Sequence, residues 1–153
     1  EVELKEKKNR VEDALSATRA AVEEGIVPGG GTALLRSRTA LDSLGLSGDE
    51  DTGVQILKRA LETPLKLICE NTGVSGEVIL AESLKSKEGW GYDAEVGEFA
   101  DLMKRGIMDP AKVTRAAIEN SASVAAMVLT TESLIADVKE KEPSMPTPPP
   151  MDY

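Results

Sequence analysis

The spacing of apolar and polar residues along most of the chain predicts helices joined by short polar loops. Four residues follow a 4-3-4 spacing that places them on one helical face: Val11, Leu15, Thr18 and Val22. We expect this first helix to run to about Gly25. Three further groups of apolar residues predict three more helices, the last within residues 76–85: Leu34, Leu35 and Leu41; Val54, Leu57 and Leu61; and Val78, Ile79 and Ala81.

Proline and glycine residues mark changes in this pattern. Pro64 is expected to be the first residue of a short additional helix that ends near Gly73. Residues 89–94, with the sequence Gly-Trp-Gly-Tyr-Asp-Ala, alternate glycine and aromatic side chains, which predicts a short strand or hairpin. A brief helix within residues 99–105 is expected to end at Gly106.

The last third of the chain contains one long helix and a proline-rich tail. Asp109 and Pro110 suit the N-cap and N1 positions of a helix that runs to about Glu132. Its many alanine and serine residues predict close packing, and we expect it to be the central core element. Residues 134–138 are a candidate terminal strand. Residues 139–153 contain five of the eight prolines, which predicts a disordered tail. The expected fold is mainly α.

Charge and hydropathy restrict the possible partners. The chain has 27 acidic and 18 basic residues and a net charge of -9, which disfavours binding to nucleic acid. No run approaches the roughly 20 apolar residues of a membrane helix, and no signal peptide opens the chain. We therefore expect neither nucleic acid nor a membrane as a partner. Because the sequence starts within a charged helical pattern and has no N-cap, we expect it to be a fragment of a longer protein.

The absence of histidine restricts the chemistry that the chain can perform. It removes the Ser/His and Cys/His catalytic arrangements and the common zinc sites, and we expect no metal site. Cys69, the single cysteine, lies in an apolar run and is interpreted as a core residue rather than a nucleophile. It leaves no intrachain disulfide, which suits a reducing compartment. Chemistry has to come from carboxylates, the backbone or a bound ion.

Gly29, Gly30 and Gly31 form the most distinctive local motif. The stretch before them has a helical pattern, which argues against the strand-first dinucleotide fingerprint. Glycines permit positive φ and the close approach of a ligand, and a helix that starts near Thr32 would direct free N–H groups toward an anion. The motif fits a nucleotide site, but taken alone it is more typical of a flexible turn between two helices.

Two aspartates stand out among acidic residues that are mostly expected to be solvated. Asp13 lies on the helix that leads into the glycine loop. An aspartate is ordinarily ionised at neutral pH and can orient water or help hold a hydrated Mg²⁺. Periodicity alone places Asp13 on an exposed helix surface. Asp109 is interpreted first as the N-cap described above and second as a ligand contact.

Longer stretches of the sequence resemble one family, the group I (GroEL-type) chaperonins. The resemblance covers about residues 1–138, in the same order and at nearly the same spacing as in the family. The chain corresponds by this resemblance to the C-terminal part of a subunit. Six segments carry it: Glu1–Lys8, Arg10–Leu15, Ala17–Gly25, Pro28–Gly31, Asp109–Arg115 and Ala122–Ala125.

The resemblance implies a domain organisation and a set of partners. Residues 1–24 would belong to an intermediate domain, and residues 25–138 would form the C-terminal half of a helical, ATP-binding equatorial domain. The family uses ATP to capture a non-native protein, enclose it in a ring cavity under a co-chaperonin lid, and release it. The implied partners are other ring subunits, the lid and client proteins. The implied compartment is the bacterial cytoplasm or an organelle stroma or matrix.

The resemblance also assigns roles to single residues. Asp13 matches the aspartate that positions the water attacking the γ-phosphate, and Gly30 matches the glycine whose backbone approaches the nucleotide. Asp109 matches the aspartate that holds the ribose, and Ile107 would lie beside the adenine.

The base-binding hairpin departs from the family pattern. The family commonly has Asn-Ala-Ala there, and this chain has Asp93, Ala94 and Glu95. An ionised aspartate accepts hydrogen bonds but does not donate as an amide does. We therefore expect the adenine contacts to be rearranged at these three residues. Pro28 also replaces a small residue and is expected to stiffen the glycine loop.

Half of the family's ATP site has no counterpart in these residues. Its phosphate loop and its Mg²⁺ aspartate come from the N-terminal part of the subunit. We expect the full-length protein to hydrolyse ATP, with Mg²⁺ held mainly by residues outside this segment, and the segment alone to be inactive. A different class of function stays open, namely a non-catalytic helical assembly or adaptor segment with no nucleotide dependence.

Overall fold

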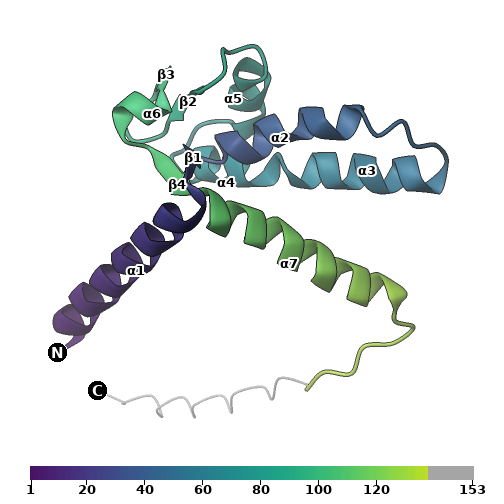
Figure 1. Ribbon diagram of the computed structural model, residues 1–153, viewed down its shortest axis with the longest axis horizontal. Coiled ribbons are helices and arrows are strands. Elements are labelled where there is room, and N and C mark those ends of the chain that lie inside the picture. Colours follow the sequence, from purple (N-terminus) through teal and green to yellow (C-terminus); the bar gives the residue numbers. More distant parts are fainter. Residues whose placement is uncertain (138–153) are drawn as a thin grey trace, which may run out of the picture.

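The computed structural model describes residues 1–137, and the predicted tail over residues 139–153 lies outside that range. The described part is mainly helical, as predicted, with two small sheets (Figure 1). Its elements in chain order are α1 (Val2–Glu24), β1 (Ile26–Pro28), α2 (Thr32–Asp42), α3 (Asp49–Ala60), α4 (Thr63–Asn71), α5 (Gly76–Ser83), β2 (Trp90–Asp93), β3 (Glu98–Asp101), α6 (Leu102–Arg105), β4 (Met108–Pro110) and α7 (Ala111–Thr130).

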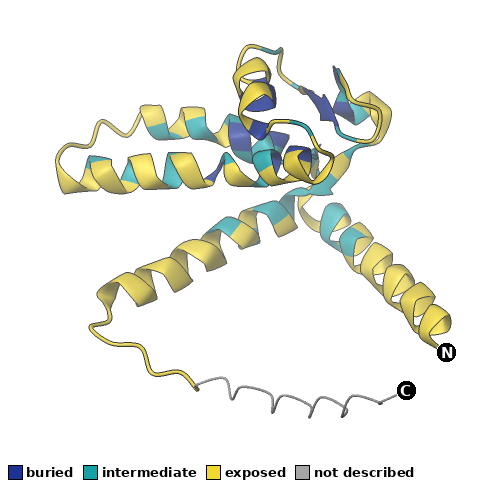
Figure 2. Cartoon of the chain, turned by 180° about the vertical axis from the view of Figure 1, so that it is seen from behind, coloured by how far each residue is buried: buried dark blue, intermediate teal, exposed yellow. Residues whose placement is uncertain are grey.

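The buried core lies where α2, α4, α5 and β2 meet (Figure 2). Its cluster of buried apolar side chains consists of Leu35, Leu65, Cys69, Ile79, Leu80 and Tyr92. Each removes apolar surface from water, the main favourable contribution to folding. Cys69 is 1% exposed, and burial raises the pKa of its thiol, so it is a core residue as predicted.

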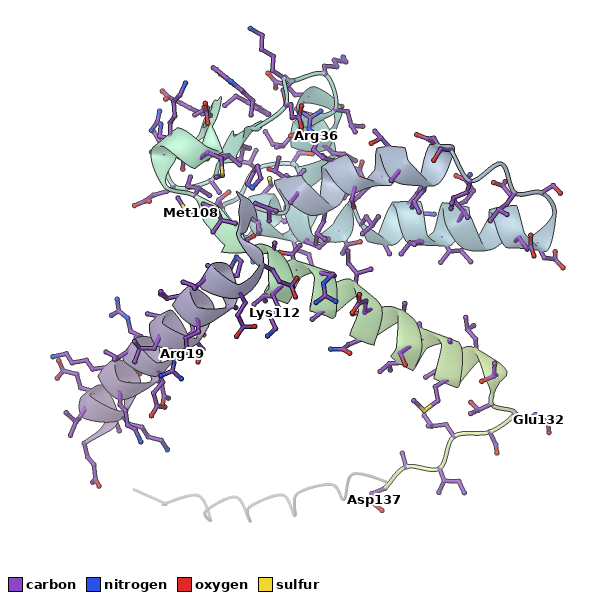
Figure 3. The ribbon with its side chains drawn as sticks, viewed as in Figure 1. Arg19, Arg36, Met108, Lys112, Glu132 and Asp137 are labelled. Carbon is purple, nitrogen blue, oxygen red and sulfur yellow. The ribbon has the colours of Figure 1, made fainter. Side chains whose placement is uncertain are left out.

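Arg36 joins α2 to the segment that follows α5 (Figure 3). Its guanidinium Nη2 donates to the carbonyl oxygens of Ser86 and Lys87 at 2.7 and 3.0 Å and to the Ser86 hydroxyl at 2.8 Å. These bonds satisfy carbonyl groups beyond the end of α5. They hold the connection between α5 and β2 against the N-terminal half of α2.

The two sheets have two antiparallel strands each. In the β2–β3 hairpin, Tyr92 lies opposite Phe99 and their ring centroids are 5.5 Å apart in a tilted arrangement. This hairpin confirms the strand expected from the Gly-Trp-Gly-Tyr pattern, although β3 takes the residues at which a brief helix was expected to begin. The β1–β4 pair joins segments that are distant in sequence, and local patterns did not predict it.

The helices α1 and α7 project from the core in different directions (Figures 1 and 2). Neither contains a buried residue, and they contact each other only near their junction, next to β4. The prediction that the long C-terminal helix is the central core element is therefore wrong for this chain. Its apolar side chains, among them Val124, Met127 and Leu129, stay more than half exposed because residues 1–137 offer nothing that covers them.

Two further expectations about the last third differ from the structure. Asp109 is not the N-cap of α7, because it is held in β4 opposite Val27 and Pro110 occupies the N-cap position. The terminal strand is not formed over residues 134–137, and Val138 lies outside the described residues. A strand needs a neighbour for its backbone groups, and no strand within the described range lies beside residues 134–137.

Candidate functional site

The β1–β4 pair brings the glycine loop beside Ile107 and Asp109. Val27 lies opposite Asp109, and the Gly29 N–H donates to the Ile107 carbonyl at 3.0 Å. A Cβ on Gly29 would lie 3.2 Å from the Met108 nitrogen, tighter than most real contacts. Glycine at this position therefore permits the close approach of the two backbones. Two segments far apart in the sequence meet here to form one wall of the candidate site.

The glycine loop leads directly into α2, whose first residue, Thr32, is 1% exposed. Gly30 and Gly31 have φ of +63° and +74°, in the left-handed region that favours glycine. Gly31 is the N-cap of α2, and no side chain accepts a hydrogen bond from the first turn of that helix. The N–H groups of a first helical turn have no partners within the helix. The Thr32 N–H donates to the Gly29 carbonyl at 3.0 Å, so only the N–H groups that follow it are open to an anionic group such as a phosphate.

The β2–β3 hairpin contributes a second wall. A Cβ on Gly30 would lie 3.7 Å from the Tyr92 carbonyl oxygen, in ordinary contact, so the glycine loop lies against β2. The next residue, Asp93, is 4% exposed, and its Oδ1 accepts hydrogen bonds from the N–H groups of Glu95 and Val96 at 3.1 and 3.4 Å. The carboxylate therefore shapes the turn that follows β2.

The remaining residues of the predicted base site differ in exposure. Ala94 is half-buried and packs against the core cluster, whereas the Glu95 side chain is exposed and its N–H is bound to Asp93. Ile107 and Asp109 are half-buried on the other wall. The structure thus brings Gly30, the hairpin turn and the Ile107–Asp109 segment together.

Asp13 is not part of this cluster. It is an exposed residue of α1, which projects away from the junction (Figure 1). It precedes Gly25 by twelve residues, which at 1.5 Å per residue corresponds to about 18 Å along the helix axis. The aspartate can approach the glycine loop only if α1 changes its orientation.

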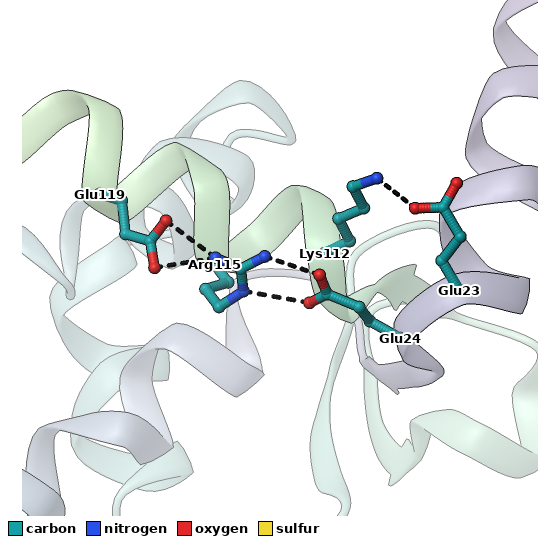
Figure 4. A network of polar contacts seen from close by, with 5 residues as sticks. All are labelled: Glu23, Glu24, Lys112, Arg115 and Glu119. Carbon is teal, nitrogen blue, oxygen red and sulfur yellow. Dashed lines mark hydrogen bonds and ion pairs between the residues drawn. The ribbon is translucent and has the colours of Figure 1, made fainter.

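A polar network joins α1 to α7 at that junction (Figure 4). Arg115 donates to both carboxylate oxygens of Glu24, at 2.6 and 3.0 Å, and to those of Glu119 at 2.9 and 2.8 Å. Lys112 forms an ion pair with Glu23. The hydrogen bond from Arg115 lowers the pKa of Glu24, and Glu24, followed by Glu119, raises the pKa of Arg115.

No local sequence pattern predicts this network, because its members are far apart in the chain. Only the Arg115–Glu119 pair, at i,i+4 spacing, has a local signal. The backbone supports the same contact, since the Ala111 N–H donates to the Gly25 carbonyl at 3.0 Å. Gly25 itself has a φ of +86°. In Figure 3, Lys112 lies at the junction and Arg19 lies farther out along α1.

The glycine loop also borders a cavity on its α7 side. This cavity of about 260 Å³ is lined by Gly31, Asp109 and mostly apolar residues of α2, α4 and α7, and does not suit a triphosphate. Within residues 1–137, no three acidic or cysteine side chains are grouped closely enough to hold a metal ion. None of the helices in that range has the length and apolar character needed to cross a membrane.

Comparison with known proteins identifies the family. Residues 1–139 match the TCP-1/cpn60 chaperonin family. The chain belongs to this chaperonin family. A solved structure described as a group III chaperonin in the open state is 34% identical, with a TM-score of 0.69, and the match covers 76% of this chain. The same match covers 25% of that protein, so this chaperonin chain spans about a quarter of its length.

The comparison supports a broader family than the group I chaperonins that the sequence resemblance suggested. It supports membership of the chaperonin family and a fold like part of a chaperonin subunit. It does not support group I in particular, because the matching structure is a group III chaperonin. The segments that carried the resemblance therefore identify the family rather than one group within it.

Proposed function

We propose that this chain is the C-terminal part of an ATP-dependent ring chaperonin subunit and supplies the base and ribose side of its ATP site. One observation carries the proposal: in a chain of the chaperonin family, Gly30, the Asp93 turn, Ile107 and Asp109 come from three separate segments and meet at an uncapped helix N-terminus. Such a cluster offers backbone donors, a carboxylate and an apolar surface to one ligand.

Each residue of the cluster has a proposed task. The backbone of Gly30 approaches the phosphates, and Asp109 accepts hydrogen bonds from the ribose hydroxyl groups. Ile107 offers an apolar surface to the adenine, and the Asp93–Glu95 turn borders its polar edge. ATP, when bound, supplies the phosphoanhydride bond whose hydrolysis drives the cycle. Mg²⁺ would be held mainly by residues outside this segment.

Asp13 has a conditional role in this proposal. Its carboxylate is suited to orient a water molecule, but α1 has to move toward the glycine loop first. Gly25 connects α1 to β1 and is the residue at which the backbone direction changes. The proposed domain division follows the same boundary, with residues 1–24 in an intermediate domain and residues 25–138 in the equatorial domain.

The activity of the whole protein is part of the proposal. We infer that the full-length subunit assembles into a ring, encloses non-native client proteins under a co-chaperonin lid and couples their release to ATP hydrolysis. The co-chaperonin lid depends on the resemblance to group I chaperonins, whereas the ring and the client proteins do not. Stimulation or inhibition of turnover by an added co-chaperonin tests that part separately.

The decisive experiment compares Asp13→Ala with unmodified full-length protein. We expect ATP binding to be retained and hydrolysis to fall by about 10²- to 10⁴-fold, the range for loss of a group that activates the nucleophile. Glu6→Ala, at another exposed acidic residue of α1, is the matched control and should keep its turnover. Equal turnover in the Asp13 variant would remove the role of Asp13. Failure of the unmodified protein to bind ATP would overturn the nucleotide site and favour an adaptor.

A further inference from the structure

Arg105 links the two walls of the candidate base site. It is the last residue of α6, and only Gly106 separates it from Ile107. Its Nη1 lies 3.6 Å from Asp93 Oδ2, and its Nη2 lies 3.4 Å from Glu98 Oε2. The Arg105 guanidinium therefore connects the end of α6 with both strands of the β2–β3 hairpin.

The Asp93 partner of this pair is nearly buried. Its side chain is 6% exposed, whereas the Arg105 side chain is 42% exposed. A buried carboxylate is costly unless it is hydrogen-bonded or paired with an opposite charge. Oδ1 is already bound to the turn N–H groups, so Arg105 supplies the charge that faces Oδ2. A neutral amide in place of this carboxylate would need no such counter-charge.

We infer that Arg105 is a positioning residue for base recognition. By holding the Asp93 carboxylate, it fixes the turn after β2 relative to the segment that contains Ile107, and the proposed base site is formed from these two segments. This inference rests on the proposed ATP site. It assigns part of the base affinity of this chain to the Arg105–Asp93 ion pair, and it makes that affinity sensitive to ionic strength.

The test is Arg105→Met in the assembled full-length protein. Methionine keeps much of the side-chain length but removes the charge and all donors. We expect the KM for ATP to rise about 3- to 10-fold, the range for a partly exposed ion pair with one buried partner. The kcat at saturation should change by less than a factor of about 2, because the reacting phosphates are elsewhere. Arg105→Lys should recover part of the affinity.

Lys104→Met is the matched control. It removes one positive charge from the same short helix, but Lys104 is 84% exposed and pairs with Asp101 at 3.2 Å rather than with the hairpin turn. Its KM should equal that of the unmodified protein. A rise in KM of similar size in both variants would overturn the inference, because it would reflect net charge rather than the Asp93 contact.

A base-free probe separates positioning from general damage. Inorganic tripolyphosphate contains the phosphates but no base, and its inhibition constant should be the same for Arg105→Met and the unmodified protein. The double variant Asp93→Asn/Arg105→Met, with a neutral amide, should bind ATP more tightly than Arg105→Met alone. If Arg105→Met assembles poorly, the double variant is compared with Asp93→Asn alone, and a KM for ATP that differs between these two would contradict the inference, because a neutral amide gives Arg105 no charge to hold.

The outcomes distinguish this inference from the proposed function. Unchanged ATP affinity in Arg105→Met, with ATP binding in the unmodified protein, would overturn the role of Arg105 and leave the ATP site intact. Equal losses for ATP and tripolyphosphate would also overturn it, because they would indicate a distorted fold. Absence of ATP binding in the unmodified protein would overturn both proposals.

Discussion

A methyl group added at Gly31 is expected to disrupt the contact between the glycine loop and α4. An ideal Cβ on this residue would lie 2.7 Å from the Leu65 nitrogen and 2.9 Å from its Cα. Real Cβ atoms do not approach backbone atoms so closely, and Leu65 is itself a buried core residue. Gly31→Ala therefore requires a shift of the α2 or α4 backbone.

The magnitude follows from two contributions. The left-handed conformation, with φ of +74°, costs a residue with a Cβ about 1–2 kcal/mol. Overpacking of a close-packed site costs about 1–3 kcal/mol more. Gly30→Ala is the matched control, because Gly30 has a φ of +63° but its added Cβ would be 3.7 Å from the nearest atom outside the adjacent residues. The two variants should thus differ by about 1–3 kcal/mol.

Hydrogen exchange in the assembled full-length protein measures this difference locally. Amide groups of α4 and of the first turn of α2 should exchange about 5- to 150-fold faster in Gly31→Ala than in Gly30→Ala, if exchange follows local opening. Peptides from the α2–α3 loop serve as an internal reference and should not differ. Equal exchange in the two variants would refute the reasoning that close backbone packing, rather than φ alone, requires glycine at residue 31.

Two other predictions follow from the same structure. Arg115→Gln should increase hydrogen exchange at the C-terminal end of α1. In the unmodified protein the Arg115–Glu24 contact should hold at neutral pH and weaken as the pH falls through the lowered pKa of Glu24, since protonation removes the charge of that carboxylate. Hydrogen exchange that responds neither to the substitution nor to the fall in pH would contradict this prediction. Gly76→Ala should destabilise the protein by about 1–3 kcal/mol, because its Cβ would lie 2.7 Å from Lys66 Cα. Gly53→Ala, inside α3 where an added Cβ would meet no other atom, should instead stabilise the protein by about 0.5–1 kcal/mol. A higher melting temperature for Gly76→Ala than for Gly53→Ala would refute the conclusion that close packing requires glycine at residue 76.

Local patterns were sufficient to predict most helices. The first helix ends at Glu24 and the second starts at Thr32, close to the expected bounds, because periodicity and glycine act within a few residues. Gly106, with a φ of +77°, ends α6 as expected. Pro64 is the second helical residue of α4 rather than the first, a difference within the usual uncertainty of helix ends.

Contacts between distant segments could not be predicted in this way. The N-cap propensity of Asp109 is real, but β1 pairs with β4 and holds the residue in an extended conformation. The Asp93–Arg105 pair and the α1–α7 network likewise depend on tertiary structure that no local pattern contains. The residues alone suggested that the glycine loop is a nucleotide site or a turn, and they left Asp13 as a solvated residue and Asp109 as a cap or a ligand contact. The roles of the remaining candidate site residues came from the resemblance.

Because α1 is a long helix that contacts the core only at its C-terminal end, a rotation about Gly25 would displace its residues in proportion to their distance from Gly25. The helix has 23 residues, so it is about 35 Å long at 1.5 Å per residue. A rotation of about 10° would move its far end by about 6 Å and Asp13 by about 3 Å, but Glu24 by only a fraction of an ångström. The ion pairs of Glu23 and Glu24 with α7 lie close to Gly25, where the displacement is smallest. They can therefore persist through a rotation of this size, while the same rotation displaces the N-terminal end of the helix by several ångströms.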